Sequence, residues 1–201
     1  MLAPKDKLTP FSTIKLDGFH VILRPPRPED CNEWLGLRRK NRKHLQPFEP
    51  RWGDEALTPD FFHRKYERQK WDWQQDLGYA FLLFTPHEER MIGALNLLHV
   101  IRGAGQQATL GYWLDQEHQG MGYMSAAIRR IIHFAGDTLK LDRLNASTID
   151  ENERSQKLLK RLGFAEEGRA RQYIEINGRR RDHILFGLLI DEFMKREEAS
   201  F

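Results

Sequence analysis

Two periodicities of apolar residues run through the chain, and each predicts a different kind of element. Alternating or continuous short apolar runs predict strands at residues 16–24, 79–84, 91–100, 107–114 and 142–149. Apolar spacings of three and four predict helices at residues 28–41, 59–76, 124–135 and 150–162. Two further strands, 171–176 and 179–189, flank Asn177-Gly178, a strong type I′ hairpin signal. The short connections between residues 79 and 114 predict three antiparallel strands.

Length and composition limit the class of protein. A chain of 201 residues with 40% apolar content can bury a full core, so we expect one domain over 1–201, with an N-terminal arm at 1–15 and a charged tail at 191–201. The single cysteine, Cys31, excludes an intramolecular disulfide and a cysteine-based metal cluster, and it suits a reducing compartment. No apolar run approaches the roughly 18 residues of a membrane span. We therefore expect a soluble cytoplasmic protein without membrane contact.

The formal net charge of +3, from 32 basic and 29 acidic residues, gives no argument for nucleic-acid binding by itself. Two local basic runs are stronger: Arg38-Arg39-Lys40 with Arg42-Lys43, and Arg179-Arg180-Arg181. Most such runs are solvated faces, and the alternative is contact with an acidic ligand, an acidic protein surface or RNA.

The segment from strand 110–114 into the next helix has the composition of an anion site. Two glycines lie just before the helix, in the sequence Gln119-Gly120-Met121-Gly122-Tyr123-Met124. A helix N-terminus presents unpaired N–H groups, and glycines allow an anion to approach the main chain closely. The alternative is an ordinary tight strand-to-helix connection. Neither the dinucleotide-binding fingerprint nor the P-loop pattern is met.

The order of elements and two motifs together resemble the GNAT family of acetyl-CoA-dependent N-acetyltransferases. Gln119-Gly120-Met121-Gly122 is similar to the family's Q/R-x-x-G-x-G/A pyrophosphate motif, with Met124 in the last Gly/Ala position. The stretch from Asn152 to Gly163-Phe164 is similar to its second signature, N-x-x-S/A ending in G-F. The finer resemblance is to the RimJ/RimL branch, which acetylates the N-termini of ribosomal proteins. It rests on Leu110-Gly111-Tyr112-Trp113-Leu114, His118-Gln119-Gly120, residues 158–164, Glu167-Gly168 and residues 178–183. The segment His44-Leu45-Gln46-Pro47-Phe48-Glu49-Pro50 favours the RimJ-like side of this branch.

The resemblance implies an α+β fold: a mixed, mostly antiparallel seven-stranded sheet flanked by about four helices and splayed between strand 107–114 and strand 142–149. It also implies how acetyl-CoA would bind. The pyrophosphate would lie on the N–H groups of Gln119, Gly120, Met121, Gly122, Tyr123 and Met124. The pantetheine would run along Trp113 and Leu114 like an added strand, and Asn152 would hold its amides. From spacing alone, Asn152 is equally well an ordinary helix N-cap. The eight histidines show no metal-ligand spacing, so no metal is expected.

The reaction implied is direct attack of a neutral amine on the thioester, which needs a proton acceptor and a proton donor. Many family members carry a tyrosine acid where this chain has Leu159, so Ser155 is the expected acid, or orients the thiolate; its alternative is an early-helix serine bonded to backbone. RimL-like members have a strand glutamate where this chain has Ile174, while Glu175 points to the other face. Glu49, Glu167 and Asp182 remain as candidate bases, and Glu49 is also a candidate ligand for the substrate ammonium.

The leading functional hypothesis is acetyl transfer to the N-terminal α-amine of a ribosomal protein that starts with alanine, with the basic runs as ribosome contacts. The alternatives are acetylation of a small amine, or an acyl-CoA-binding, ribosome-associated module with little catalysis. The sequence leaves a monomer and a homodimer equally open.

Overall fold

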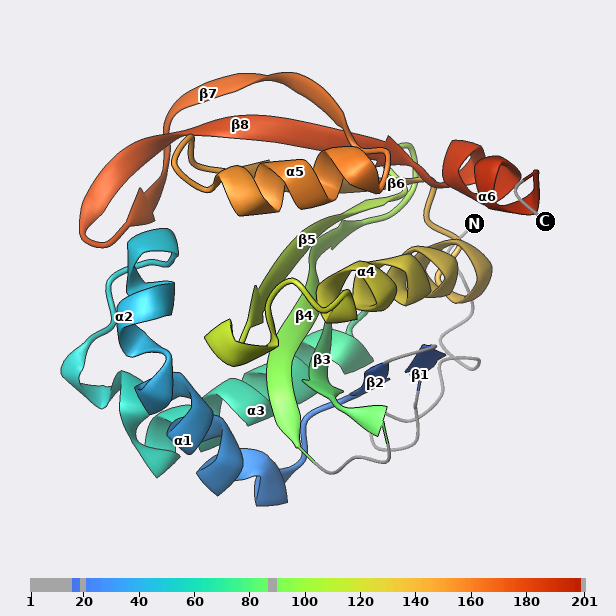
Figure 1. Ribbon diagram of the computed structural model, residues 1–201. Coiled ribbons are helices and arrows are strands. Elements are labelled where there is room, and N and C mark those ends of the chain that lie inside the picture. The colour runs from blue at the N-terminus through green and yellow to red at the C-terminus, as the bar shows by residue number, and fades with distance from the viewer. Residues whose placement is uncertain (1–15, 19–20, 87–89, 200–201) are drawn as a thin grey trace.

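A computed structural model describes residues 16–18, 21–86 and 90–199, and the expected N-terminal arm therefore lies outside the described residues. The strands are β1 (Leu16–Gly18), β2 (Val21–Arg24), β3 (Tyr79–Phe84), β4 (Met91–Ile101), β5 (Gln107–Leu114), β6 (Arg143–Thr148), β7 (Ala165–Ile176) and β8 (Arg179–Leu189). The helices are α1 (Cys31–Lys40), α2 (Arg42–Leu45), α3 (Pro59–Gln74), α4 (Tyr123–His133), α5 (Glu153–Arg161) and α6 (Ile190–Glu198). Figure 1 shows their arrangement.

One sheet contains all the described strands, in the order β1-β2-β3-β4-β5-β6-β8-β7. Neighbours pair antiparallel except β5 and β6, which pair in parallel. The antiparallel β3-β4-β5 meander confirms the prediction from short connections. The parallel pair is also the interrupted one: its register runs from Gln107↔Arg143 to Thr109↔Asn145 and ends there. The predicted splay between these two strands is confirmed.

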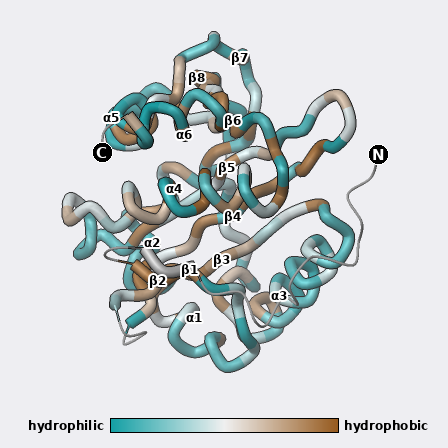
Figure 2. Tube along the Cα trace, turned by 90° about the vertical axis from the view of Figure 1, so that its right-hand side faces the viewer, coloured by the Kyte–Doolittle hydropathy of each residue, from teal (hydrophilic) through white to brown (hydrophobic). Residues whose placement is uncertain are grey.

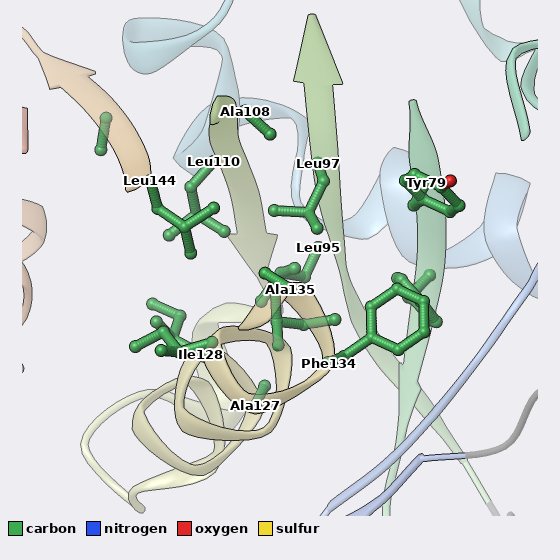
Figure 3. Packing of buried hydrophobic residues seen from close by; sticks show 14 of the residues in the cluster. Tyr79, Leu95, Leu97, Ala108, Leu110, Ala127, Ile128, Phe134, Ala135 and Leu144 are labelled. Atoms are coloured by element: carbon green, nitrogen blue, oxygen red, sulfur yellow. The ribbon is translucent and has the colours of Figure 1, made fainter. Parts of the chain in front are cut away.

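Helices cover both faces of the sheet. The larger hydrophobic cluster joins α4 and α5 to the central strands, and a second cluster joins α1 and α3 to β2, β3 and β4. Figure 3 shows Leu95, Leu97 and Leu110 of the sheet facing Ile128 and Ala135. In Figure 2 the hydrophobic segments concentrate along the inner strands, while the helices present hydrophilic positions outward. This double covering explains why β3 is buried at every position.

Local sequence signals fix several helix ends. Thr58 caps α3, because its Oγ1 accepts a hydrogen bond from Phe61 N at 3.3 Å, and Pro59 follows at the first helical position. Gly163 ends α5 with φ of +90°, and Phe164 N donates back to Leu159 O at 3.0 Å. Asn177 and Gly178 both have positive φ, 48° and 82°, as a type I′ turn requires.

The β7-β8 hairpin crosses to the other half of the molecule. Its tip lies beside the segment after α2 (Figure 1), and Asn177 N donates to Glu49 O at 2.9 Å. Arg51 N lies 3.4 Å from Glu175 Oε1. Two sequence segments are thereby connected, with Arg51 and Glu175 separated by 124 residues along the chain.

Two details of the predicted fold are wrong, the number of strands and the number of helices. The single strand expected at 16–24 is two short antiparallel strands, so the sheet of described residues has eight strands instead of seven. Alternation cannot reveal a chain reversal inside an apolar run. The charged tail from residue 191 belongs to the helix α6, which buries Ile190 and Phe193. With α2, the described residues form six α-helices instead of about four.

Candidate active site

The segment between β5 and α4 has the geometry of an anion cradle. Gly120 and Gly122 have φ of +78° and +86°, a region that glycine occupies without strain. A Cβ at either position would have no protein atom within 4 Å, so open space lies beside both. Gly122 is the N-cap of α4, and no side chain caps the first N–H groups of this helix. Unpaired N–H groups at a helix start, facing open space, suit a phosphate.

A buried carboxylate holds this loop to α1. Asp115, directly after β5 and 1% exposed, accepts from Asn41 Nδ2 at 2.7 Å and contacts His118 Nδ1 at 2.6 Å. Asn41 completes the connection by accepting from Gln116 N at 2.9 Å. Burial by itself would raise the pKa of Asp115, but these hydrogen bonds and Lys40 outweigh burial and lower that pKa. The start of the cradle is therefore fixed by a charge-assisted network.

A second contact fixes the cradle near its centre. The side-chain nitrogen of Gln119 lies 2.6 Å from His44 Nε2. Burial lowers the pKa of His44, and nearby Arg154 lowers it further, so the imidazole is neutral and its Nε2 can accept from the amide. The motif residue Gln119 is thus oriented by His44, from the segment before Glu49.

The splay leaves one side of β5 without a β6 partner beyond Thr109. Residues 110–114 pair with β4 on the other side, from Leu97↔Leu110 to Gly93↔Leu114. Main-chain groups of Trp113 and Leu114 on the splayed side can therefore accept an extended amide-bearing ligand as an added strand. Alternation sends Tyr112 and Leu114 to the face of α4 and α5, and Trp113 to the face of α1 and α3.

Ser155 lies on the α4 and α5 side of the splay, in contact with Tyr112, which the sequence analysis did not identify as a site residue. Its Oγ is 2.6 Å from Tyr112 Oη. Asn152 is the N-cap of α5, because its Oδ1 accepts from Ser155 N at 3.2 Å. Burial raises the pKa of Tyr112 to about 12, against the opposing effect of the Ser155 hydrogen bond. The one sequence signal for Tyr112 was its alternation with Leu110 and Leu114, which directs it to this face.

Glu49 lies on the opposite side, in a cluster of aromatic and basic groups. Arg38 NH1 and NH2 donate to its two carboxylate oxygens at 2.7 and 2.5 Å, and Trp52 Nε1 donates at 2.8 Å. The Arg38 guanidinium is 4.0 Å from the centre of the Trp52 ring and 5.1 Å from that of Trp113. Since a carboxylate offers about four acceptor positions, three are filled and one remains.

Lys65 of α3 adds a second cation to this side. Its side chain is exposed, yet the surrounding protein removes enough water from the ammonium group to lower its pKa. Arg38 lowers that pKa further, and Glu49 opposes the change. Two cations, Lys65 and Arg38, therefore surround the single negative charge of Glu49.

The other carboxylates considered as bases are held elsewhere. Glu167 forms an ion pair with Arg143. Asp182 accepts from Gln172 N at 2.9 Å and pairs with Arg169, and these two contacts lower its pKa. Glu175 lies next to Arg51 N at the hairpin tip. The structure therefore brings Ser155 and Asn152 together, and it places Glu49 beyond Trp113 on the other face of the sheet.

The basic runs are only partly solvated. Arg38 is 9% exposed and binds Glu49, while Lys40 pairs with Glu117 at 2.6 Å. Arg181 pairs with Glu151. Arg180 donates to backbone oxygens of the hairpin.

Comparison with known proteins agrees with this geometry. Residues 20–165 match the family model described as acetyltransferase (GNAT) domain. The chain is 34% identical over 174 residues to Probable N-acetyltransferase YjcK of Bacillus subtilis, covering 87% of this chain and 96% of that protein. It is 31% identical over 175 residues to the [ribosomal protein uS5]-alanine N-acetyltransferase of Escherichia coli, covering 87% and 90%. The structure of Mycobacterium smegmatis RimJ in complex with CoA-disulfide superposes with a TM-score of 0.83, at 27% identity over 90% of this chain and 88% of that one.

The protein is therefore an acetyltransferase that belongs to the GNAT family. Members of this family take the acetyl group from acetyl-CoA, and the cradle and splay have the form that such a donor needs. Among the described residues, no three His, Cys, Asp or Glu side chains are grouped to hold a metal ion. No described helix combines the length and the apolar character that crossing a membrane requires.

Proposed function

We propose that this protein transfers the acetyl group of acetyl-CoA to the N-terminal α-amine of a protein, and that the acceptor is a ribosomal protein beginning with alanine. The observation that carries this proposal is that Glu49, bound to Arg38 beside Trp113, lies on the opposite face of the splayed strand from Tyr112 and Ser155. The similarity to the E. coli uS5-alanine N-acetyltransferase over nearly the full length of both chains supports the ribosomal acceptor.

On the donor side, the N–H groups of Gly120 to Met124 would bind the pyrophosphate of acetyl-CoA. Gln119 N, which the sequence analysis included in this set, donates instead to Gln116 O at 3.3 Å. The main chain of Trp113 and Leu114 would pair with the pantetheine, and Asn152 would contact its amides in addition to capping α5. Acetyl-CoA supplies the activated thioester. Ser155, at the splay, would donate a proton or a hydrogen bond to the sulfur as the C–S bond breaks.

On the acceptor side, the remaining acceptor position of Glu49 would bind the substrate ammonium. Arg38 and Trp52 fix the orientation of the carboxylate, so its open position is directed without a cost in side-chain freedom. An α-amine has a pKa of about 7.7 to 8.0, against about 10.4 for lysine. A large fraction of an N-terminal substrate is therefore neutral near pH 7.5, and it needs no strong base.

The test is acetylation of a peptide panel by the purified protein. Peptides beginning with alanine or serine are incubated with acetyl-CoA, beside the same peptides blocked at the N-terminus and beside a polyamine. The proposal predicts one added acetyl group on the free N-terminus, found by mass spectrometry, and no reaction of the blocked peptides. Preference for the polyamine would contradict the proposed acceptor, and acetyl-CoA binding without any transfer would contradict catalysis.

A further inference from the structure

Two hydroxyl groups from distant parts of the chain meet beside the splayed strand. Tyr112 is on β5, Ser155 is in the first turn of α5, and their oxygens are 2.6 Å apart. Both side chains are largely buried but keep some exposed surface through which a ligand can reach them. Leu159, one turn further along α5, is fully buried in the core and offers no hydroxyl.

The direction of this hydrogen bond follows from the acidity of the two groups. A phenol with an ordinary pKa of about 10 is a far stronger acid than an alkyl hydroxyl, so it is the better donor. The phenol is neutral near pH 7 even with its ordinary pKa of about 10, and burial raises this pKa to about 12. Tyr112 therefore donates and Ser155 Oγ accepts, which leaves the Ser155 hydrogen free for a third atom.

Contacts from the Asn152 and Tyr112 side chains fix where that hydrogen can be directed. Asn152 Oδ1 accepts from Ser155 N, which holds the start of α5 at the edge of the splay. Tyr112 fills one lone pair of Ser155 Oγ and thereby restricts rotation of the hydroxyl. The Ser155 hydroxyl is therefore restricted to one orientation before the donor substrate binds.

We propose that Tyr112 is a positioning residue that acts through Ser155: its Oη–H polarises Ser155 Oγ, whose own hydrogen is donated to the departing CoA sulfur. This inference deepens the proposed function and rests on its assignment of Ser155 to the sulfur.

The step balances without any additional reactant. The amine nitrogen forms a bond to the acetyl carbon, the C–S bond breaks, and its electron pair goes to sulfur. Sulfur takes the hydrogen of Ser155, Ser155 takes the hydrogen of Tyr112, and the phenolate is reprotonated by the proton that nitrogen releases on becoming an amide. The products are the N-acetyl amide and the CoA thiol.

The first experiment needs no acceptor. CoA labelled with ¹³C at the carbon next to sulfur is bound to the protein, and the thiol is titrated by the chemical shift of that carbon. Hydrogen-bond donation to the thiolate lowers the pKa of the bound thiol relative to free CoA. In Tyr112→Phe the pKa of the bound thiol should be lowered less than in the wild-type protein. In Ser155→Ala the lowering should disappear, and the double variant should give the same thiol pKa as Ser155→Ala. An unshifted thiol in the wild-type protein, or a Tyr112→Phe titration equal to wild type, would overturn the proposal.

The second experiment measures turnover with whichever amine the wild-type protein acetylates best, so that a wrong acceptor assignment does not affect it. Tyr112→Phe should lower kcat by about tenfold to hundredfold, with little change in the KM for acetyl-CoA. The double variant should be no slower than Ser155→Ala, because the two residues act as one unit. Fully multiplicative losses, or a loss in KM alone, would mean that Tyr112 does not act through Ser155.

Tyr79→Phe is the matched control. It also deletes a tyrosine hydroxyl that is hydrogen-bonded, here to Asp76 at 2.5 Å, but at the start of β3 in the core. This variant should keep the wild-type kcat and the wild-type CoA titration. Equal losses in kcat for Tyr79→Phe and Tyr112→Phe would assign both effects to packing and overturn the proposal.

Discussion

Substitution of Gly122 by alanine tests whether the glycine-bearing loop is a phosphate cradle. With φ of +86°, Gly122 occupies a region that costs an L-residue about 1–2 kcal/mol. The new methyl group would contact no protein atom within 4 Å, so the free protein should still fold, with a melting temperature about 2–8 °C lower. Bound CoA would meet that methyl group, or lose an N–H group displaced by relaxation of the strain. Losing one hydrogen bond to a charged oxygen costs about 1.5–3 kcal/mol, or about tenfold to hundredfold in Kd.

Gly103→Ala separates strain from binding. Gly103 has φ of +69° and equally open surroundings, but it lies in the turn between β4 and β5. Both variants are measured by thermal unfolding and by isothermal titration with CoA. We expect similar losses of stability, with weaker CoA binding in Gly122→Ala alone. Wild-type affinity in Gly122→Ala would refute the cradle, and equal weakening in both variants would show that the effect is not local.

Three further predictions concern the groups around the cradle and the acceptor. Asp115→Asn should lower the free energy of unfolding by about 2–3 kcal/mol and weaken CoA binding, as seen in denaturant melts and calorimetry, because the buried donors lose a charged acceptor. Because the folded pKa of Asp115 is depressed, its stabilisation is full above about pH 3.9 and is lost as pH falls through the folded pKa; acid melts of wild type and Asp115→Asn should therefore converge in that range. Glu49→Gln should raise the KM for an alanine-initiated peptide and leave the KM for acetyl-CoA unchanged; equal KM values for wild type and variant would remove Glu49 from the acceptor site.

Local signals were sufficient for most of the elements. Strands β3 and β5 have the predicted bounds, because β3 is a continuous apolar run and the bulky stretch 110–114 of β5 ends at the polar segment from Asp115. The cap at Thr58 and the glycine at residue 163 set helix ends that the sequence shows directly. The cradle and the splay also followed from sequence, the first from its glycines and the second from the family resemblance.

The contacts that define the site were beyond sequence reasoning. Tyr112 and Ser155 are 43 residues apart, and Asn41 and Asp115 are 74 apart, so only packing of the whole sheet brings them together. Arg38 belongs to a basic run of the kind that usually lies in solvent, and its burial depends on Trp52 and Glu49 closing over it. Composition shows which charges a chain carries, whereas their partners depend on tertiary structure.

The most direct measurement of the central claim is the acetylation site on an alanine-initiated peptide that also contains an internal lysine. The peptide is incubated with the purified protein and acetyl-CoA, and fragment masses locate the added group. We predict a single acetyl group on the α-nitrogen, at a rate that rises with pH to about 7.7–8.0 and then levels off. Acetylation of the lysine, or a rate that keeps rising toward pH 10, would contradict the account.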